Sequence, residues 1–136
     1  MTLKVGQVAT IEKCLDKNSV AQFATLAEDY NPVHLDEEFA ATTPFERPIV
    51  HGMLASSLVS GILASKLPGS GSIYLGQTLK FVCPIFVGET ITAKVEVTHI
   101  REDKPIATLA TQIFNQAGEL AVSGEATVRY PVVNNE

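Results

Sequence analysis

The chain has 136 residues, of which 46% are hydrophobic and 18% charged, and it fits one globular domain, 1–136, with a substantial core. The formal net charge of −5, with no cluster of Lys or Arg, argues against a nucleic-acid-binding surface. The first residues alternate between polar and apolar, and the apolar stretch 49–67 is interrupted by His51, serines and glycines, so we expect neither a signal peptide nor any membrane span.

The first half of the chain predicts one strand followed by helices. Loose alternation predicts a strand over 7–14. Asp16 is a suitable N-cap, and apolar residues at positions i, i+3, i+4 and i+7 predict an amphipathic helix over 17–28. Acidic residues in a first turn predict a short helix over 36–41, and the proline-containing segment 42–48 is predicted to be a loop.

A second, more apolar helix is predicted over 52–66. Its large apolar residues recur at helical spacing, small residues fill the other positions, and no charge occurs before Lys66. Because a helix without a charged face is normally buried, we expect this helix to lie in the core.

The second half of the chain predicts long antiparallel strands. Stretches rich in Val, Ile, Thr and Phe alternate in polarity and are separated by turn residues; they cover 72–83, 89–101, 105–115 and 120–130. One buried helix and a run of such strands predict an α+β domain with a sheet curled around the helix. The edges and open face of such a sheet need covering, so we expect a homodimer.

The two cysteines, Cys14 and Cys83, are distant in sequence and form no CxxC motif. We interpret them as reduced, buried or half-buried thiols of a cytoplasmic protein.

Candidate chemistry centres on Asp29 and His34, which flank Asn31-Pro32. Proline fixes its own φ and pushes Asn31 away from helical geometry, so a turn holds the carboxylate and the imidazole near each other. A carboxylate accepts a proton, and an imidazole gives or takes one near neutral pH. If both contact one water molecule, they can add it across an electron-poor double bond, or run the elimination.

The helix that follows offers a place for the developing negative charge. Its first N–H groups carry partial positive charge, and Gly52 allows close approach, which predicts an oxyanion site. Ser60 either bonds back to its own helix or orients Asp29 or His34. His51 either faces the site or satisfies local backbone, and His99, at a strand end among charges, is expected in solvent.

Two other kinds of site are not supported by the sequence. A metal site built from Asp29, His34, Asp36 and His51 has no recognised ligand spacing, so no metal or other cofactor is predicted. The segment 69–71 (GSG) follows a helix instead of preceding one, which is the wrong context for a phosphate loop.

At these residues the chain resembles the MaoC-like hot-dog hydratases. The segment 29–34 (DYNPVH), with Ala40 six residues after His34, is similar to the hydratase motif of that family. The resemblance continues through 39–43, 45–54, 71–77 and 101–109, and it is strongest to short-chain (R)-specific enoyl-CoA hydratases of polyhydroxyalkanoate and fatty acid metabolism. One departure is Glu28, where the family often has Gly.

The resemblance implies a fold, a reaction and a set of residues. The fold is a long helix wrapped by a five-stranded antiparallel sheet that dimerises. The reaction is syn hydration of a trans-2-enoyl-CoA thioester to the (R)-3-hydroxyacyl-CoA. Asp29 and His34 would be the catalytic dyad, Ser60 their hydroxyl partner, and the Gly52 N–H the donor to the thioester carbonyl. We favour Asp29 as the group that activates water and His34 as the donor to C2, and the reverse allocation stays open.

Three rival functions remain open. Hot-dog thioesterases often carry a carboxylate on the central helix, and carrier-protein dehydratases pair their His with a helical acid; 53–67 contains neither Asp nor Glu. A non-catalytic acyl-CoA-binding module would make Asp29 and His34 incidental. The CoA phosphates need cations, for which the candidates are Arg47, Lys66, Lys80, Arg101 and Lys104.

Overall fold

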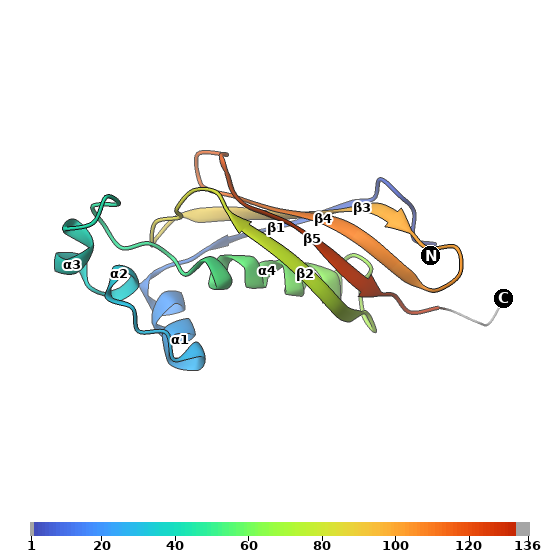
Figure 1. Cartoon of the computed structure of the whole chain (residues 1–136), viewed down its shortest axis with the longest axis horizontal. Coiled ribbons are helices and arrows are strands. Elements are labelled where there is room, and N and C mark those ends of the chain that lie inside the picture. The colour runs from blue at the N-terminus through green and yellow to red at the C-terminus, as the bar shows by residue number, and fades with distance from the viewer. Residues whose placement is uncertain (1, 133–136) are drawn as a thin grey trace.

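The computed structural model describes residues 2–132. These residues form four helices and five strands, whose arrangement Figure 1 shows. The helices are α1 (Lys17–Ala27), α2 (Pro32–Leu35), α3 (Glu37–Ala41) and α4 (Gly52–Ser65). The strands are β1 (Val8–Cys14), β2 (Ile73–Phe81), β3 (Thr90–Ile100), β4 (Ile106–Phe114) and β5 (Leu120–Arg129).

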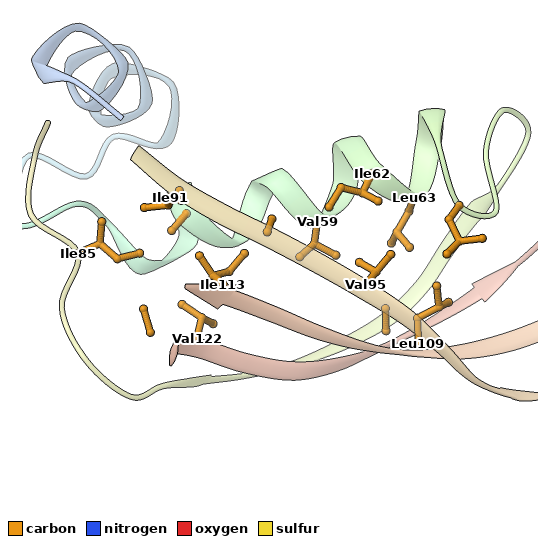
Figure 2. Packing of buried hydrophobic residues seen from close by; sticks show 14 of the residues in the cluster. Val59, Ile62, Leu63, Ile85, Ile91, Val95, Leu109, Ile113 and Val122 are labelled. Atoms are coloured by element: carbon orange, nitrogen blue, oxygen red, sulfur yellow. The ribbon is translucent and has the colours of Figure 1, made fainter. Parts of the chain in front are cut away.

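The five strands form one antiparallel sheet that curls along α4. The strand order is β1-β3-β4-β5-β2, so β1 and β2 are the edges. Figure 2 shows side chains of α4, such as Val59 and Ile62, packed against Val95, Leu109 and Ile113 of the sheet. The predicted α+β arrangement, a hot dog with its helix wrapped by five strands, is confirmed.

The alternation in the strands explains which face packs on α4. In β3 the residues Ile91, Ala93, Val95 and Val97 are fully buried, while the residues between them are partly exposed. Because successive side chains of a strand point to opposite faces, this strand contributes one complete apolar row to the core. The four predicted strands of the second half match the observed ones to within a few residues.

The helices α1, α2 and α3 lie beyond one end of the sheet (Figure 1). The turn at Asn31-Pro32 was expected, but the structure adds a short helix there. Asn31 is the N-cap of α2, its side chain accepts a hydrogen bond from the N–H of Val33, and Pro32 occupies the first helical position. A proline is suited to that position because its missing N–H would have no intrahelical acceptor.

Helix α4 was expected to be buried, but in a single chain only one of its faces is buried. Ala55, Val59 and Ile62 are buried, but the opposite face is exposed and carries Met53, Ser57, Ser60, Gly61 and Ala64. A face with no charge is poorly suited to solvent. The edge strand β2 is similarly apolar, with Ile73, Tyr74, Leu75 and Phe81 more than 40% exposed.

Both cysteines are free thiols, but they differ in exposure. Cys83 is half-buried as predicted, whereas Cys14 is exposed, which corrects the expectation that both are sheltered. Cys14 lies on β1 in the same alternation as Thr10 and Glu12, on the face of the strand that is exposed. Within residues 2–132, no helix has the length and apolarity needed to cross a membrane.

Candidate active site

Asp29 directly follows the end of α1. The residue before it, Glu28, has φ 57° and ψ 33° and caps the helix in the left-handed conformation. The N–H of Asp29 donates to the carbonyl of Ala24 at 3.0 Å, and its carboxylate accepts from the N–H of Asn31 at 3.2 Å. The left-handed residue reverses the chain, and these two bonds fix Asp29 in the turn. Gly adopts this left-handed conformation without strain, which is a physical reason for the Gly that the resemblance leads one to expect at position 28.

His34 is held by the segment that leads into α4. It lies on α2, and its Nδ1 is 2.7 Å from the carbonyl oxygen of Ile49. A carbonyl oxygen only accepts, so Nδ1 carries the hydrogen and Nε2 is the atom left to exchange a proton. A backbone bond from Ile49 to Val33 at 3.1 Å ties the same two segments together.

His51 is the third residue of the site and its second imidazole. Its side chain is 2% exposed, its Nε2 is 3.1 Å from the carbonyl oxygen of Asp29, and its ring stacks on His34 with centroids 3.9 Å apart. Burial lowers the pKa of His51 from its ordinary 6.5, although the Asp29 carbonyl acts in the opposite direction. His51 therefore faces the site, which was one of the two interpretations from the sequence. The other, a bond to local backbone, is wrong, because its partner is the carbonyl of Asp29, 22 residues away.

The three side chains converge on one point. A carboxylate oxygen of Asp29 and ring nitrogens of His34 and His51 lie within 4.8 Å of one another. One water molecule bonded to two partners spans up to about 5.6 Å, so a single water can contact Asp29 and His34 together. Asp36 was a further candidate ligand of the metal site that the sequence did not support. Its carboxylate instead caps α3, where it accepts hydrogen bonds from the N–H groups of Glu38 and Phe39.

The dyad opens onto an apolar pocket of ≈ 390 Å³. Gly52, at the start of α4, lines this pocket together with Asp29 and His34, and the remaining lining is mostly Phe, Ile, Val and Met. The first N–H groups of a helix lack intrahelical acceptors, so the Gly52 end of α4 presents donors beside the dyad. The arrangement combines proton-transfer groups, a possible oxyanion donor and space for an apolar substrate.

Cys83 also lines this pocket but is unsuited to covalent chemistry. Burial, and next the charges of Glu119 and Glu89, raise the pKa of its thiol above the ordinary 9.0. Since the thiolate is the nucleophilic form, the raised pKa makes Cys83 a weaker nucleophile near neutral pH than an ordinary cysteine.

Ser60 is not brought to the dyad of its own chain. It lies eight residues after Gly52, about 12 Å along the helix axis, and its side chain is on the exposed face of α4. Within residues 2–132, no hydrogen bond joins Ser60 to Asp29 or His34. His99 is exposed, as expected.

The cations that are candidates for binding the CoA phosphates differ in the contacts that they make within the chain. Arg47 lies over the ring of Phe86 at 3.8 Å, Lys66 donates to the carbonyl of Thr10, and Arg101 pairs with Asp103. Lys80 and Lys104 are exposed, and neither makes a salt bridge within the part of the chain that the structure describes.

Sequence reasoning missed two features of this site. The stacking of His51 on His34 was not predicted, although a histidine at a helix N-cap is an unusual choice that signals another role. The second missed feature is the contact of Phe81, on β2, with Gly52. The Phe81 ring lies so close that a Cβ at position 52 would overlap it. No local pattern signals a contact between residues so far apart.

Comparisons with known proteins show the family to which the chain belongs. The MaoC like domain matches residues 3–129. The chain is 63% identical over 130 residues to an (R)-specific enoyl-CoA hydratase of Aeromonas caviae, covering 96% of this chain and 97% of that protein. It is 41% identical to a protein of the same description from Rhodospirillum rubrum, covering 95% and 89%. The solved structure of an A. caviae (R)-hydratase involved in PHA biosynthesis superposes with a TM-score of 0.94 at 63% identity, covering 96% and 98%. The chain belongs to the MaoC-like domain family.

Proposed function

We propose that this protein is an (R)-specific enoyl-CoA hydratase, a hydro-lyase that reversibly adds water to a trans-2-enoyl-CoA thioester. The observation that carries this proposal is the placement of an Asp29 carboxylate oxygen and a His34 ring nitrogen within 4.8 Å of each other at an apolar pocket. Two proton-transfer groups that share one water suit hydration and its reverse. The 63% identity to a hydratase of the same description, over nearly the full length of both chains, supports the same reaction.

In the proposed reaction Asp29 and His34 divide the two proton transfers. Asp29 takes a proton from the bound water as the water oxygen bonds to C3 of the enoyl group. His34, protonated on both ring nitrogens, gives the Nε2 proton to C2 and becomes a neutral ring, while its Nδ1–H bond to the Ile49 carbonyl keeps the ring in place. Because both groups approach the double bond from the same wall of the pocket, hydrogen and hydroxyl add to one face. The reverse allocation of acid and base uses the same geometry.

Gly52 is proposed to bind the thioester oxygen. Negative charge develops on this oxygen when water adds to C3. Gly52 supports this role because it begins α4, where the N–H groups lack intrahelical acceptors, and because it lines the pocket that Asp29 and His34 also line. A backbone donor on a rigid helix needs no rearrangement as the charge develops. No cofactor is needed for this chemistry.

We further propose that the protein works as a homodimer and that Ser60 acts across its interface. The uncharged face of α4 and the apolar edge strand β2 are the surfaces that a second copy would cover. Ser60 lies on that face, out of reach of its own dyad, so its orienting role requires the partner's α4 to approach Asp29 and His34.

The proposed partners and setting follow from the substrate. The ligand is a CoA thioester, with no nucleic acid or membrane partner, and its phosphates would be met by exposed cations such as Lys80 or Lys104. A place in polyhydroxyalkanoate biosynthesis is proposed by similarity to the A. caviae hydratase. A role in fatty acid metabolism and a cytoplasmic location are proposed from the sequence.

The deciding experiment mixes the purified protein with crotonyl-CoA and follows the conjugated enoyl absorbance and free thiol together. Loss of absorbance without thiol release is the expected result, and coupling to a dehydrogenase specific for the (R)-3-hydroxyacyl product tests the stereochemistry. Thiol release would instead identify a thioesterase. No change with crotonyl-CoA, longer enoyl-CoA thioesters or a carrier-bound enoyl group would leave only a binding function and would contradict the proposal.

A further inference from the structure

His51 occupies the N-cap of α4 without capping it. An N-cap side chain normally accepts a hydrogen bond from the second or third N–H of the helix, which is why Ser, Thr, Asp and Asn are preferred. The ring of His51 makes no such bond. It is turned into the protein and is 2% exposed. The reason for a histidine at this position therefore lies in its other contacts.

Those contacts join both members of the dyad. Nε2 of His51 is 3.1 Å from the carbonyl oxygen of Asp29, a bond that spans 22 residues and ties the turn after α1 to the start of α4. The ring stacks on His34 with centroids 3.9 Å apart and planes 30° apart. The ring of Phe23, on α1, also packs against His51, with ring centroids 4.9 Å apart and planes tilted by 59°.

The hydrogen bond also determines which ring nitrogen of His51 carries the proton. The Asp29 carbonyl can only accept, so Nε2 carries the hydrogen. Nδ1 is buried and has no hydrogen-bond partner within residues 2–132. A proton on Nδ1 would be a buried donor without an acceptor, and would put a positive charge 3.9 Å from the ring of His34. The neutral Nε2–H ring avoids both costs.

We propose that His51 is a positioning residue of the hydration reaction: a neutral imidazole that fixes the backbone of Asp29 and the ring plane of His34 so that both reach the same water. This inference rests on the proposed hydratase function. The titratable groups that face His51 are Asp29 and His34, and the ring from α1 is the apolar Phe23. A neutral His51 leaves the proton-transfer role to His34, because it adds no competing charge beside it.

A pair of substitutions separates the two contacts. His51→Phe keeps an aromatic face against His34 but removes the donor to Asp29. His51→Gln keeps a donor at a similar reach but removes the aromatic face. We expect kcat with crotonyl-CoA to fall about tenfold in His51→Phe, the size of one lost hydrogen bond, and to stay within about threefold in His51→Gln, with KM nearly unchanged in both. His99→Phe and His99→Gln are matched controls, because His99 is an exposed strand residue.

The pH profile of kcat/KM distinguishes positioning from proton transfer. We expect both His51 variants to keep both limbs of the wild-type profile. Loss of the same limb in both variants would make His51 an acid or base and overturn the proposal. An unchanged kcat in His51→Phe would also overturn it.

A spectroscopic test needs no turnover and no variant. Long-range proton–nitrogen NMR spectra of the imidazoles should show His51 at pH 7 with hydrogen on Nε2 and none on Nδ1. A doubly protonated ring, or hydrogen on Nδ1 alone, would overturn the proposal. If His51 has the expected tautomer but the wild-type protein hydrates no enoyl thioester, the proposed function fails while the arrangement of His51 stands.

Discussion

The aromatic ring of Phe81 lies against the Cα of Gly52, so that strand β2 covers the start of α4. A Cβ added to Gly52 would overlap the Phe81 ring, and both residues line the pocket that holds Asp29 and His34. The absence of a side chain at position 52 therefore admits the ring, and in the proposed mechanism the same residue donates its N–H to the thioester oxygen.

Gly52→Ala is expected to lower both stability and activity. Overpacking of this kind typically costs about 1–3 kcal/mol of unfolding free energy. It should also lower kcat/KM by about tenfold or more, because a misplaced thioester oxygen loses its donor. Thermal unfolding and the crotonyl-CoA assay measure the two effects.

The double variant Gly52→Ala with Phe81→Ala separates the effect on stability from the effect on activity. Removing the ring should restore stability toward that of Phe81→Ala alone, whereas kcat/KM should stay low. If activity returns with stability, Gly52 matters only for packing and the proposed oxyanion role is wrong.

Asp29→Asn and His34→Gln should each lower kcat by about 10²–10⁴, the usual contribution of a positioned acid or base. Both substitutions are close in shape, so the fold and substrate binding should be kept. Asp36→Asn is the matched control, since Asp36 caps α3 and Asn is also a good cap. Near-normal turnover in either dyad variant would remove that residue from the mechanism.

The fold was largely predictable because its signals are local. Alternation of polarity in β3 and β4, the uncharged sequence of α4 and the cap at Asp16 each specify an element without reference to the rest of the chain. The short helix α2 was missed because Asn31-Pro32 is typical of turns and of helix starts alike, and four residues are too few to show a period.

The site was predictable only in part, for a physical reason. Asp29 and His34 are close in sequence and share one turn, so their proximity follows from local chemistry. The stacking of His51 on His34 and the contact of Phe81 with Gly52 depend on tertiary packing, which no spacing encodes. The exposure of Ser60 depends on which face of α4 the sheet covers, and the sequence of an uncharged helix does not mark that face.

Glu28→Gly should raise the stability of the protein. Glu28 has φ 57°, where a side chain costs roughly 1–2 kcal/mol, and Gly avoids this cost while losing some backbone entropy on folding. We expect a net gain of about 0.5–1 kcal/mol in the free energy of unfolding, measured by chemical denaturation. Glu38→Gly is the matched control on α3, where Gly should instead destabilise. A loss of stability in Glu28→Gly would show that the Glu side chain contributes more than its conformation costs.

Subunit mixing tests whether Ser60 acts across a dimer. Asp29→Ala and Ser60→Ala are each expected to have low activity as homodimers. If the partner's Ser60 serves each dyad, a heterodimer of the two variants contains one fully native site and should recover about half of the wild-type kcat per dimer. Co-expression with two affinity tags isolates that heterodimer. If Ser60 acted within its own chain, both sites of the heterodimer would carry a defect and no recovery would follow.

Stability should depend on pH through His51. Burial lowers the pKa of His51 in the folded protein, whereas in the unfolded chain it returns to about its ordinary 6.5. Between these two values the unfolded chain binds more protons than the folded protein, so the free energy of unfolding falls as the pH drops below 6.5. The slope from this one group is at most about 1.4 kcal/mol per pH unit. Denaturant unfolding of wild type and His51→Gln between pH 5.5 and 7.5 isolates the effect, with His99→Gln as the control. The difference in stability between wild type and His51→Gln should shrink or reverse toward acid pH, and a difference that is constant with pH would mean that His51 is not held neutral by burial.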